Sequence, residues 1–198
     1  MSSLLTAQAR LQTEADALVV KLDLVALLSA IGKPVRVGSS AMGLMVRRDI
    51  DITVICPKLD ATLLAEFAAI GAGLMGRADI VSHVRFRNDS GSWNAEPDAY
   101  PDGLYLGLTV RDEAGKSWSF EIWAIDDPTR QPDLRHLETL LPRLSDANRT
   151  TILAIKAALL AETQQPGPSA WVYEAVMDHG VTDLATFKDW RRRMGKVN

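Results

Sequence analysis

The stretch DIDITVIC, residues 49–56, constrains the fold more than any other part of this sequence, because polar and apolar side chains alternate along it. Such alternation is typical of a β-strand with one buried face. It puts Asp49 and Asp51 on the same face, with their side chains starting about 6.6 Å apart. Two carboxylates at this spacing repel each other unless a cation lies between them. A solvated sheet face would show the same pattern, so the pair alone leaves both interpretations open.

The segment immediately before this strand favours a binding site. GSSAMG, residues 38–43, follows another predicted strand and puts Gly38 and Ser39 at a strand-to-helix turn. Glycine permits close approach of the backbone to a ligand, and free amides at a helix start attract anions. The Ser39 hydroxyl adds a hydrogen-bond donor for a phosphate oxygen. A phosphate-binding turn beside a carboxylate pair that suits Mg²⁺ is more specific than either feature alone.

Hydrophobic periodicity predicts helices at the start of the chain and a sheet in its middle. A helix is expected over residues 3–31, with Asp23 restarting it as a second helix that ends at Gly32. A further helix over 60–74 begins at Asp60, a typical N-cap residue. The predicted strands cover residues 34–38, 49–56, 79–87, 104–111 and 116–125, the last two as a hairpin.

The segments outside these elements differ in composition. Residues 88–103 are rich in Gly, Pro, Asn and Asp, and their length predicts a functional or mobile loop rather than a simple connection. Several prolines follow the hairpin, and helical patterns then cover residues 146–163, 169–180 and 181–195. We therefore expect a sheet region with flanking helices, followed by a helical region, with the boundary near 130–145.

Composition excludes several classes of protein. The 198 residues suit one large domain or two small ones, and the net charge of −3 gives no case for a dedicated nucleic-acid or membrane binder. The single cysteine, Cys56, cannot form an intrachain disulfide and is expected to be a buried strand residue in a reducing compartment. Neither a signal peptide nor a transmembrane run is recognisable, so a cytoplasmic protein is expected.

The glycines and carboxylates together carry a family resemblance. The order of these residues resembles the signature of the nucleotidyltransferase superfamily, which includes DNA polymerase beta, poly(A) polymerases and aminoglycoside nucleotidyltransferases. The matching residues are Gly38-Ser39, then Gly43, then Asp49-Ile50-Asp51. That family carries a third carboxylate on a later strand. SWSFEIWAI, residues 117–125, is similar to that strand, with Glu121 at the acidic position.

The resemblance implies a fold and an activity. The fold is α+β: a small mixed β-sheet with flanking helices in residues 1–140, followed by a C-terminal helical substrate-binding region in residues 141–198. The activity is transfer of a nucleoside monophosphate from a nucleoside triphosphate, such as ATP, to an acceptor hydroxyl, with release of pyrophosphate. Two Mg²⁺ ions would act during turnover. The implied residues are Asp49, Asp51 and Glu121 for catalysis and metal binding, and Gly38, Ser39, Ser40, Arg47 and Arg48 for nucleotide binding.

Alternatives stay open at several of these residues. Arg47 and Arg48 either contact phosphates or are solvated loop charges. Lys156 either reaches the cleft or, as the sequence favours, snorkels to the surface. Trp171 and Tyr173 either form a stacking wall for a ligand or, as the sequence favours, pack in a helical core.

The acceptor and the catalytic status also stay open. The acceptor is a small molecule, a protein or an RNA end, and the charge argues against a membrane or a long nucleic acid as partner. The alternative function is a non-catalytic nucleotidyltransferase-like binding or regulatory protein of the toxin–antitoxin type. The presence of all three carboxylates favours the enzyme.

Overall fold

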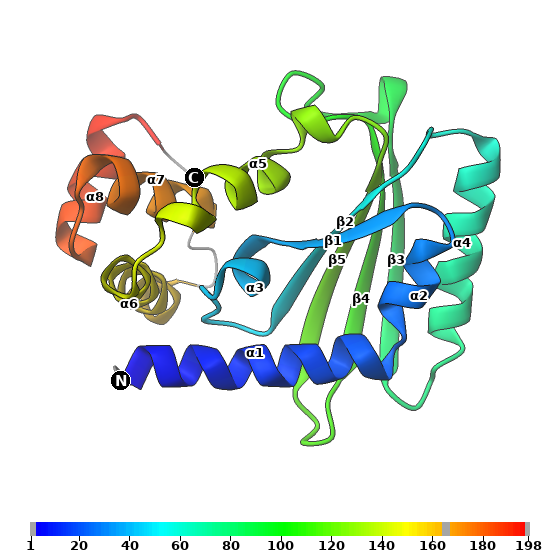
Figure 1. Cartoon of the computed structure of the whole chain (residues 1–198), viewed down its shortest axis with the longest axis horizontal. Helices are drawn as coiled ribbons and strands as arrows, with labels where there is room; N and C mark the ends of the chain where they lie inside the picture. The colour runs from blue at the N-terminus through cyan, green and yellow to red at the C-terminus, as the bar shows by residue number, and fades with distance from the viewer. Residues whose placement is uncertain (1–2, 164–166, 197–198) are drawn as a thin grey trace.

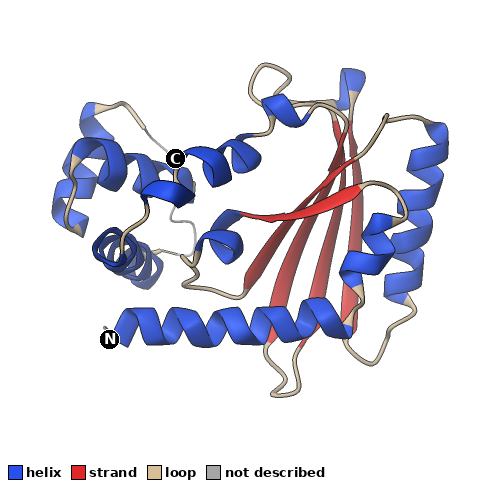
Figure 2. Ribbon diagram, viewed as in Figure 1, coloured by secondary structure: helices blue, strands red, loops and turns tan. Residues whose placement is uncertain are grey.

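The protein forms a mixed β-sheet with helices on both sides, and the computed structural model describes residues 3–163 and 167–196 (Figure 2). The five-stranded sheet has the order β1-β2-β5-β4-β3. β2 and β5 run parallel, whereas the other neighbouring strands run antiparallel. The strands are β1 Lys33–Val37, β2 Asp49–Ile55, β3 Val81–Asp89, β4 Gly103–Arg111 and β5 Ser117–Ile125. The expected α+β fold with a small mixed sheet is confirmed.

Three helices cover one face of the sheet, and the later helices gather on the other side (Figure 1). The covering helices are α1 Ser3–Lys21, α2 Leu24–Ser29 and α4 Ala61–Met75. The others are α3 Gly38–Met42, α5 Pro132–Thr139, α6 Asp146–Glu162, α7 Ser169–His179 and α8 Leu184–Arg193. Short 3₁₀ turns lie at Gly91–Trp93, Pro128–Arg130 and Leu141–Arg143. Among the described residues, no helix has both the length and the apolar character needed to cross a membrane.

The first hydrophobic core fills the space between the sheet and helices α1, α2 and α4. Ile50 of β2 and Trp118, Phe120 and Ile122 of β5 are fully buried in it. Removing an Ile or Phe side chain from water contributes about 1.5–3 kcal/mol. Because strand residues alternate, this burial forces the residues between them to the opposite face of the sheet.

A second hydrophobic core lies among α6, α7 and α8. It includes Met42 and Leu44, which belong to the segment that joins β1 to β2. Arg149 of α6 also donates a hydrogen bond to the Met42 carbonyl. The helical region therefore packs directly against the segment that leads into the carboxylate strand. A domain division at residue 140 stays a prediction.

Most predicted elements lie within two residues of the observed ones. Asp60 caps α4 as expected, with its carboxylate accepting from the amides of Thr62 and Leu63 at 3.1 Å each. Asp23 separates α1 from α2, because it adopts the left-handed conformation with a φ of 52°. Cys56 is buried, as predicted.

The connection between β3 and β4 differs from the prediction. β3 begins two residues later than expected, because the Arg77 carbonyl accepts from the Val81 amide at 2.8 Å and holds a turn there. β3 then continues further, so the loop covers only residues 90–102. The carboxylate of Asp102 accepts from the Gly91 amide at 3.0 Å and holds this loop against the start of β4.

Helix α5 lies where the prolines of the sequence indicate a break. Pro132 is its first residue, a position where the missing N–H of proline would have no partner inside the helix. α5 follows the 3₁₀ turn Pro128–Arg130 after β5 and lies between the sheet and the C-terminal helices, near α3 (Figure 1).

The β4–β5 hairpin depends on Asp112 at its turn. The carboxylate accepts from the amides of Ala114 and Lys116 at 2.9 and 2.8 Å, and from Nε1 of the buried Trp118 at 3.1 Å. Asp112→Ala leaves these donors unpaired, so it should lower the free energy of unfolding in urea by about 1–3 kcal/mol. Glu113→Ala, at the exposed next position, is the control and should change it by less than about 0.5 kcal/mol. Equal effects of the two substitutions would contradict this account.

Candidate active site

The parallel pairing of β2 with β5 assembles the carboxylates. In the register of these strands, Asp51 lies beside Glu121 and Asp49 lies beside Ser119. Register neighbours on adjacent strands share a face of the sheet, so the three carboxylates project from the face opposite the first core. Glu121 therefore lies on the strand and face that the sequence predicts. Its role in catalysis stays a prediction.

The turn from β1 into α3 packs against Asp51. Val37 at the end of β1 pairs with Asp51, and Gly38 follows with a φ of +64°. A Cβ at Gly38 would lie 2.3 Å from Oδ2 of Asp51. The sequence predicts that this glycine lets a phosphate approach, whereas in the structure its nearest neighbour is the Asp51 carboxylate. Glycine is thus required here by both backbone conformation and space.

The two serines of the turn differ in their partners. Ser40 is buried, and its hydroxyl accepts from Nε of Arg36 at 3.1 Å and donates to the Val37 carbonyl at 3.3 Å. Ser40 therefore joins α3 to β1, which argues against its predicted contact with phosphate. Within the described residues, the Ser39 hydroxyl makes no hydrogen bond, so it remains available to a ligand. Because α3 has only five residues, these individual groups matter more than the helix dipole.

The neighbouring arginines point in opposite directions. Nε of Arg47 donates to Oδ2 of Asp49 at 2.7 Å. The Arg48 guanidinium instead lies 3.6 Å from Oε2 of Glu14 in α1 and 5.9 Å from the centre of the Trp118 ring. Trp118 belongs to the first core, so Arg48 lies on the core side of the sheet. This placement follows from the alternation of side chains before β2 and does not favour a contact between Arg48 and the nucleotide, which stays a prediction.

The carboxylate face carries excess negative charge. Burial raises the pKa of Asp51 to about 8, and the charges of Asp49, Asp133 and Glu121 add to the effect. Oδ1 of Asp49 is buried and has no hydrogen-bond partner. A buried carboxylate oxygen without a partner is costly, so a cation would stabilise this face, where Arg47 forms an ion pair with Asp49.

The donor set fits Mg²⁺ that arrives with a ligand. In the part of the chain that the structure describes, no group of three or more His, Cys, Asp or Glu side chains is placed to hold a metal ion by itself. Mg²⁺ does not need such a group, because one or two carboxylates with waters and substrate phosphates complete its octahedral shell. Asp49, with its unpartnered Oδ1, and Asp51 can provide those two carboxylates.

Lys156 is a candidate site residue, although the sequence favours a position at the surface. It is 8% exposed, and its Nζ donates to the Leu44 carbonyl at 2.8 Å and to the Tyr173 hydroxyl at 3.2 Å. The prediction of a snorkelling lysine is wrong, because α7 and the segment before β2 cover this side of α6. Its place within the apolar stripe of α6 was the signal for burial. Tyr173 is buried in the second core, as predicted.

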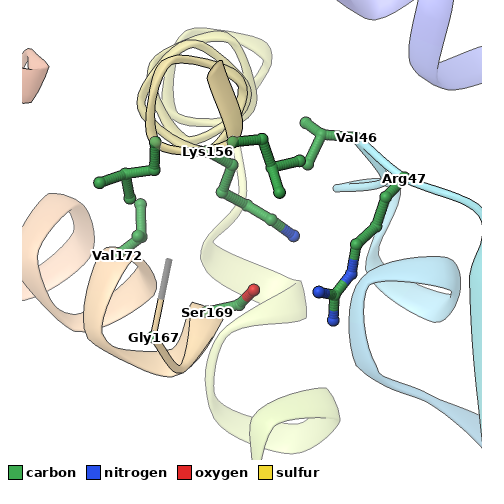
Figure 3. Close-up of a pocket in the computed structure, with 8 residues that line it drawn as sticks. Val46, Arg47, Lys156, Gly167, Ser169 and Val172 are labelled. Carbon is green, nitrogen blue, oxygen red and sulfur yellow. The ribbon is translucent and has the colours of Figure 1, made fainter. Parts of the chain in front are cut away.

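Lys156 and Arg47 point into one small cavity, with Ser169 of α7 on another side (Figure 3). The cavity has a volume of about 20 Å³, enough for a water molecule and far too little for a nucleotide base. Burial lowers the pKa of Lys156 to about 8, and Asp49 and Asp51 act in the opposite direction. Two cationic groups thus lie on the Asp49 side of the carboxylates.

Comparison with known proteins identifies the fold. No model of a known protein family matches the sequence, and no curated protein matches it. A solved structure of Cid1 with the UTP analogue UMPNPP matches with a TM-score of 0.56 and 17% identity, over 84% of this chain and 48% of that chain. The Cid1 poly(U) polymerase with MgGTP bound matches with a TM-score of 0.55 and 17% identity, over 84% of this chain and 49% of that chain. The chain has a nucleotidyltransferase fold.

The likeness has two limits that bear on function. The chain spans about half the length of the Cid1 structures that it matches. An identity of 17% establishes the nucleotidyltransferase fold alone, so the activity has to be argued from the residues of the site.

The raised pKa of Asp51 gives a pH-dependent stability. Between its ordinary pKa of 3.8 and about 8, the folded protein binds a proton that the unfolded chain releases. The stability of the metal-free protein should therefore fall as pH rises from about 5 to about 8 and then level off. Asp51→Asn removes this group, so it should flatten the slope and gain most stability at high pH. Urea denaturation in EDTA measures both proteins.

The control for this prediction is Glu66→Gln, a carboxylate removed from the exposed side of α4. It should keep the wild-type slope. Identical slopes for wild type and Asp51→Asn between about pH 5 and pH 8 would contradict the charged, desolvated site.

Proposed function

We propose that this protein is a metal-dependent nucleotidyltransferase, which moves a nucleoside monophosphate from a nucleoside triphosphate to an acceptor hydroxyl and releases pyrophosphate. The observation that carries the proposal is the register of β2 and β5, which puts Asp49, Asp51 and Glu121 on one face of a nucleotidyltransferase fold. The similar Cid1 structures contain a UTP analogue and MgGTP, which supports a nucleoside triphosphate as the donor.

Positive charge on the Asp49 side supports binding of the triphosphate there. Arg47 and Lys156 line the cavity beside Asp49. In the part of the chain that the structure describes, the Ser39 hydroxyl has no hydrogen-bond partner. A guanidinium binds phosphate as readily as carboxylate, so an arriving triphosphate competes with Asp49 for Arg47. Arg47 would then contact phosphate, and Asp49 would be free to ligate Mg²⁺.

The three carboxylates have distinct roles in this proposal. Asp49 and Asp51 would hold the Mg²⁺ that accompanies the triphosphate, and Glu121 would help to hold a second ion. When bound, the ions supply positive charge that offsets the charge developing on the phosphate oxygens.

The transfer itself is a single displacement. The acceptor oxygen forms a bond to the α-phosphorus, the bond from that phosphorus to the bridging oxygen breaks, and pyrophosphate leaves with the electron pair. Glu121, whose carboxylate is exposed beside Asp51, accepts the proton of the acceptor hydroxyl.

Glu121→Gln tests the proposal, because it keeps the shape of the side chain and removes its charge. Magnesium-dependent pyrophosphate release should fall by roughly 10²–10⁴-fold with acceptor pools and each of the four triphosphates. The rise in melting temperature caused by MgATP should persist, since the residues proposed to bind the triphosphate and its Mg²⁺ are unchanged. Glu113→Gln, on the hairpin turn, is the control. Full activity of Glu121→Gln, or no release by wild type, would leave only a non-catalytic binding protein.

The two arginines before β2 provide a matched test of whether the triphosphate binds beside Asp49. Arg47→Gln removes a guanidinium beside Asp49 and should weaken MgATP binding roughly tenfold in isothermal titration. Arg48→Gln makes the same chemical change one residue away, on the core side, and should leave the affinity unchanged. Equal losses in the two variants would mean that the nucleotide does not bind beside Asp49.

A further inference from the structure

Strand β3 forms one end of the sheet and, among the described residues, pairs with β4 alone (Figure 1). Beyond this pairing, the backbone groups of residues 82–88 make no hydrogen bond to any part of the chain that the structure describes. The strand at the other end of the sheet, β1, has only five residues and includes Pro34, which has no N–H to donate. β3 therefore offers the sheet edge that can pair with a further strand.

The free part of β3 is long enough to recognise a peptide. The register of β3 with β4 shifts between Val81 and His83 and is then regular to Asp89. These residues, 83–89, are called the β3 edge and span about 23 Å at 3.3 Å per residue. Their side chains are all exposed or half-buried. A peptide that adds to such an edge gains affinity from main-chain hydrogen bonds and specificity from alternate side chains.

One face of the β3 edge carries positive charge. Arg85 and Arg87 alternate on this face, with His83 two residues before them. Nη2 of Arg85 donates to the Tyr105 hydroxyl at 2.8 Å, and within the described residues no carboxylate lies at ion-pair distance from this guanidinium. Arg87 forms an ion pair with Asp89 at 3.2 Å. The unpaired charge of Arg85 therefore favours a carboxylate on the same face of an added strand.

The opposite face of the β3 edge is apolar. Phe86 lies on this face, with its ring 5.6 Å from that of the fully buried Phe67 in α4. Phe86 is nevertheless 38% exposed, at the end of the sheet. Trp93, in the 3₁₀ turn that follows β3, is 73% exposed. Aromatic residues are enriched in protein–protein interfaces, so an apolar side chain of an added strand would find a partner in Phe86.

We infer that the β3 edge is a docking site for an extended, acidic segment of a partner protein, which adds to the sheet as a sixth strand. The backbone of the segment would pair with residues 83–89. Its glutamate or aspartate side chains would face Arg85 and Arg87, and the apolar side chains between them would cover Phe86. This docking site lies two strands away from Glu121 and does not require the proposed activity.

The charges of the β3 edge select against other occupants. A second copy of this chain is disfavoured, because pairing of two β3 strands would bring their arginines together. A nucleic acid could neutralise the arginines, but it cannot continue the backbone pairing of the sheet. A peptide with alternating acidic and apolar residues matches the charge, the backbone groups and the exposed Phe86 at once.

Four fluorescein-labelled peptides test the docking site by fluorescence anisotropy with the full chain. TEVEVET supplies alternating acids, TKVKVKT reverses their charge, TETETET lacks the valines, and TEPEVET carries a proline that interrupts strand pairing. TEVEVET should bind at least about tenfold more tightly than TKVKVKT and TEPEVET, because these lose the charge match and the backbone pairing. It should bind at least about threefold more tightly than TETETET, which leaves Phe86 uncovered.

Variants of the chain assign the peptide to this edge. Arg85→Glu should weaken TEVEVET binding at least about tenfold and abolish the preference for TEVEVET over TKVKVKT. Phe86→Thr should abolish the preference for TEVEVET over TETETET. Arg193→Glu makes the same change of charge at an exposed position of α8 and should leave TEVEVET binding unchanged.

Amide hydrogen exchange locates the bound peptide on the unmodified chain. TEVEVET should slow exchange of backbone amides within residues 83–89, and the amides of β1 should keep their rates. The inference is overturned if protection appears elsewhere, if any of the other three peptides binds as tightly as TEVEVET, or if Arg85→Glu binds TEVEVET like wild type. It is likewise overturned if an RNA hexamer binds more tightly than TEVEVET, or if the chain sediments as a dimer that Phe86→Thr dissociates.

Discussion

The parallel pairing of β2 with β5 is the constraint on which the site depends. It sets Asp51 and Glu121 side by side and holds Asp49 on the same face. The pairing is fixed by the first core, because a one-residue shift would turn Ile50 and Phe120 outward and the carboxylates inward. The burial that stabilises the fold therefore also imposes a cluster of like charges on the opposite face.

The charges around this cluster are unevenly distributed. Arg47 and Lys156 lie on the Asp49 side, where α6 and the segment before β2 meet. On the Glu121 side, a cavity of about 350 Å³ is lined by further carboxylates, Glu96 and Asp133. An anionic donor is therefore favoured on the Asp49 side.

The sequence was sufficient for the sheet, because alternation in β2 and β5 follows directly from which face is buried. It also predicted the strand and face of Glu121, since its strand pattern and the family resemblance agree. Less could be predicted where the position of a side chain depends on tertiary packing. The structure pairs Arg48 with Glu14 and Ser40 with Arg36, and neither pairing follows from a local pattern. The burial of Lys156 depends on α7, although its place within the apolar stripe of α6 was a local signal for it.

Manganese binding tests the central claim most directly, namely that the carboxylates of β2 and β5 form an incomplete metal site which a nucleotide completes. Mn²⁺ can replace Mg²⁺ and is counted by electron paramagnetic resonance, with and without a non-hydrolysable ATP analogue. The account predicts weak Mn²⁺ binding by the protein alone, at least about tenfold tighter binding with the analogue, and loss of that gain in Asp51→Asn. Equally tight Mn²⁺ binding without nucleotide, or an undiminished gain in Asp51→Asn, would contradict it.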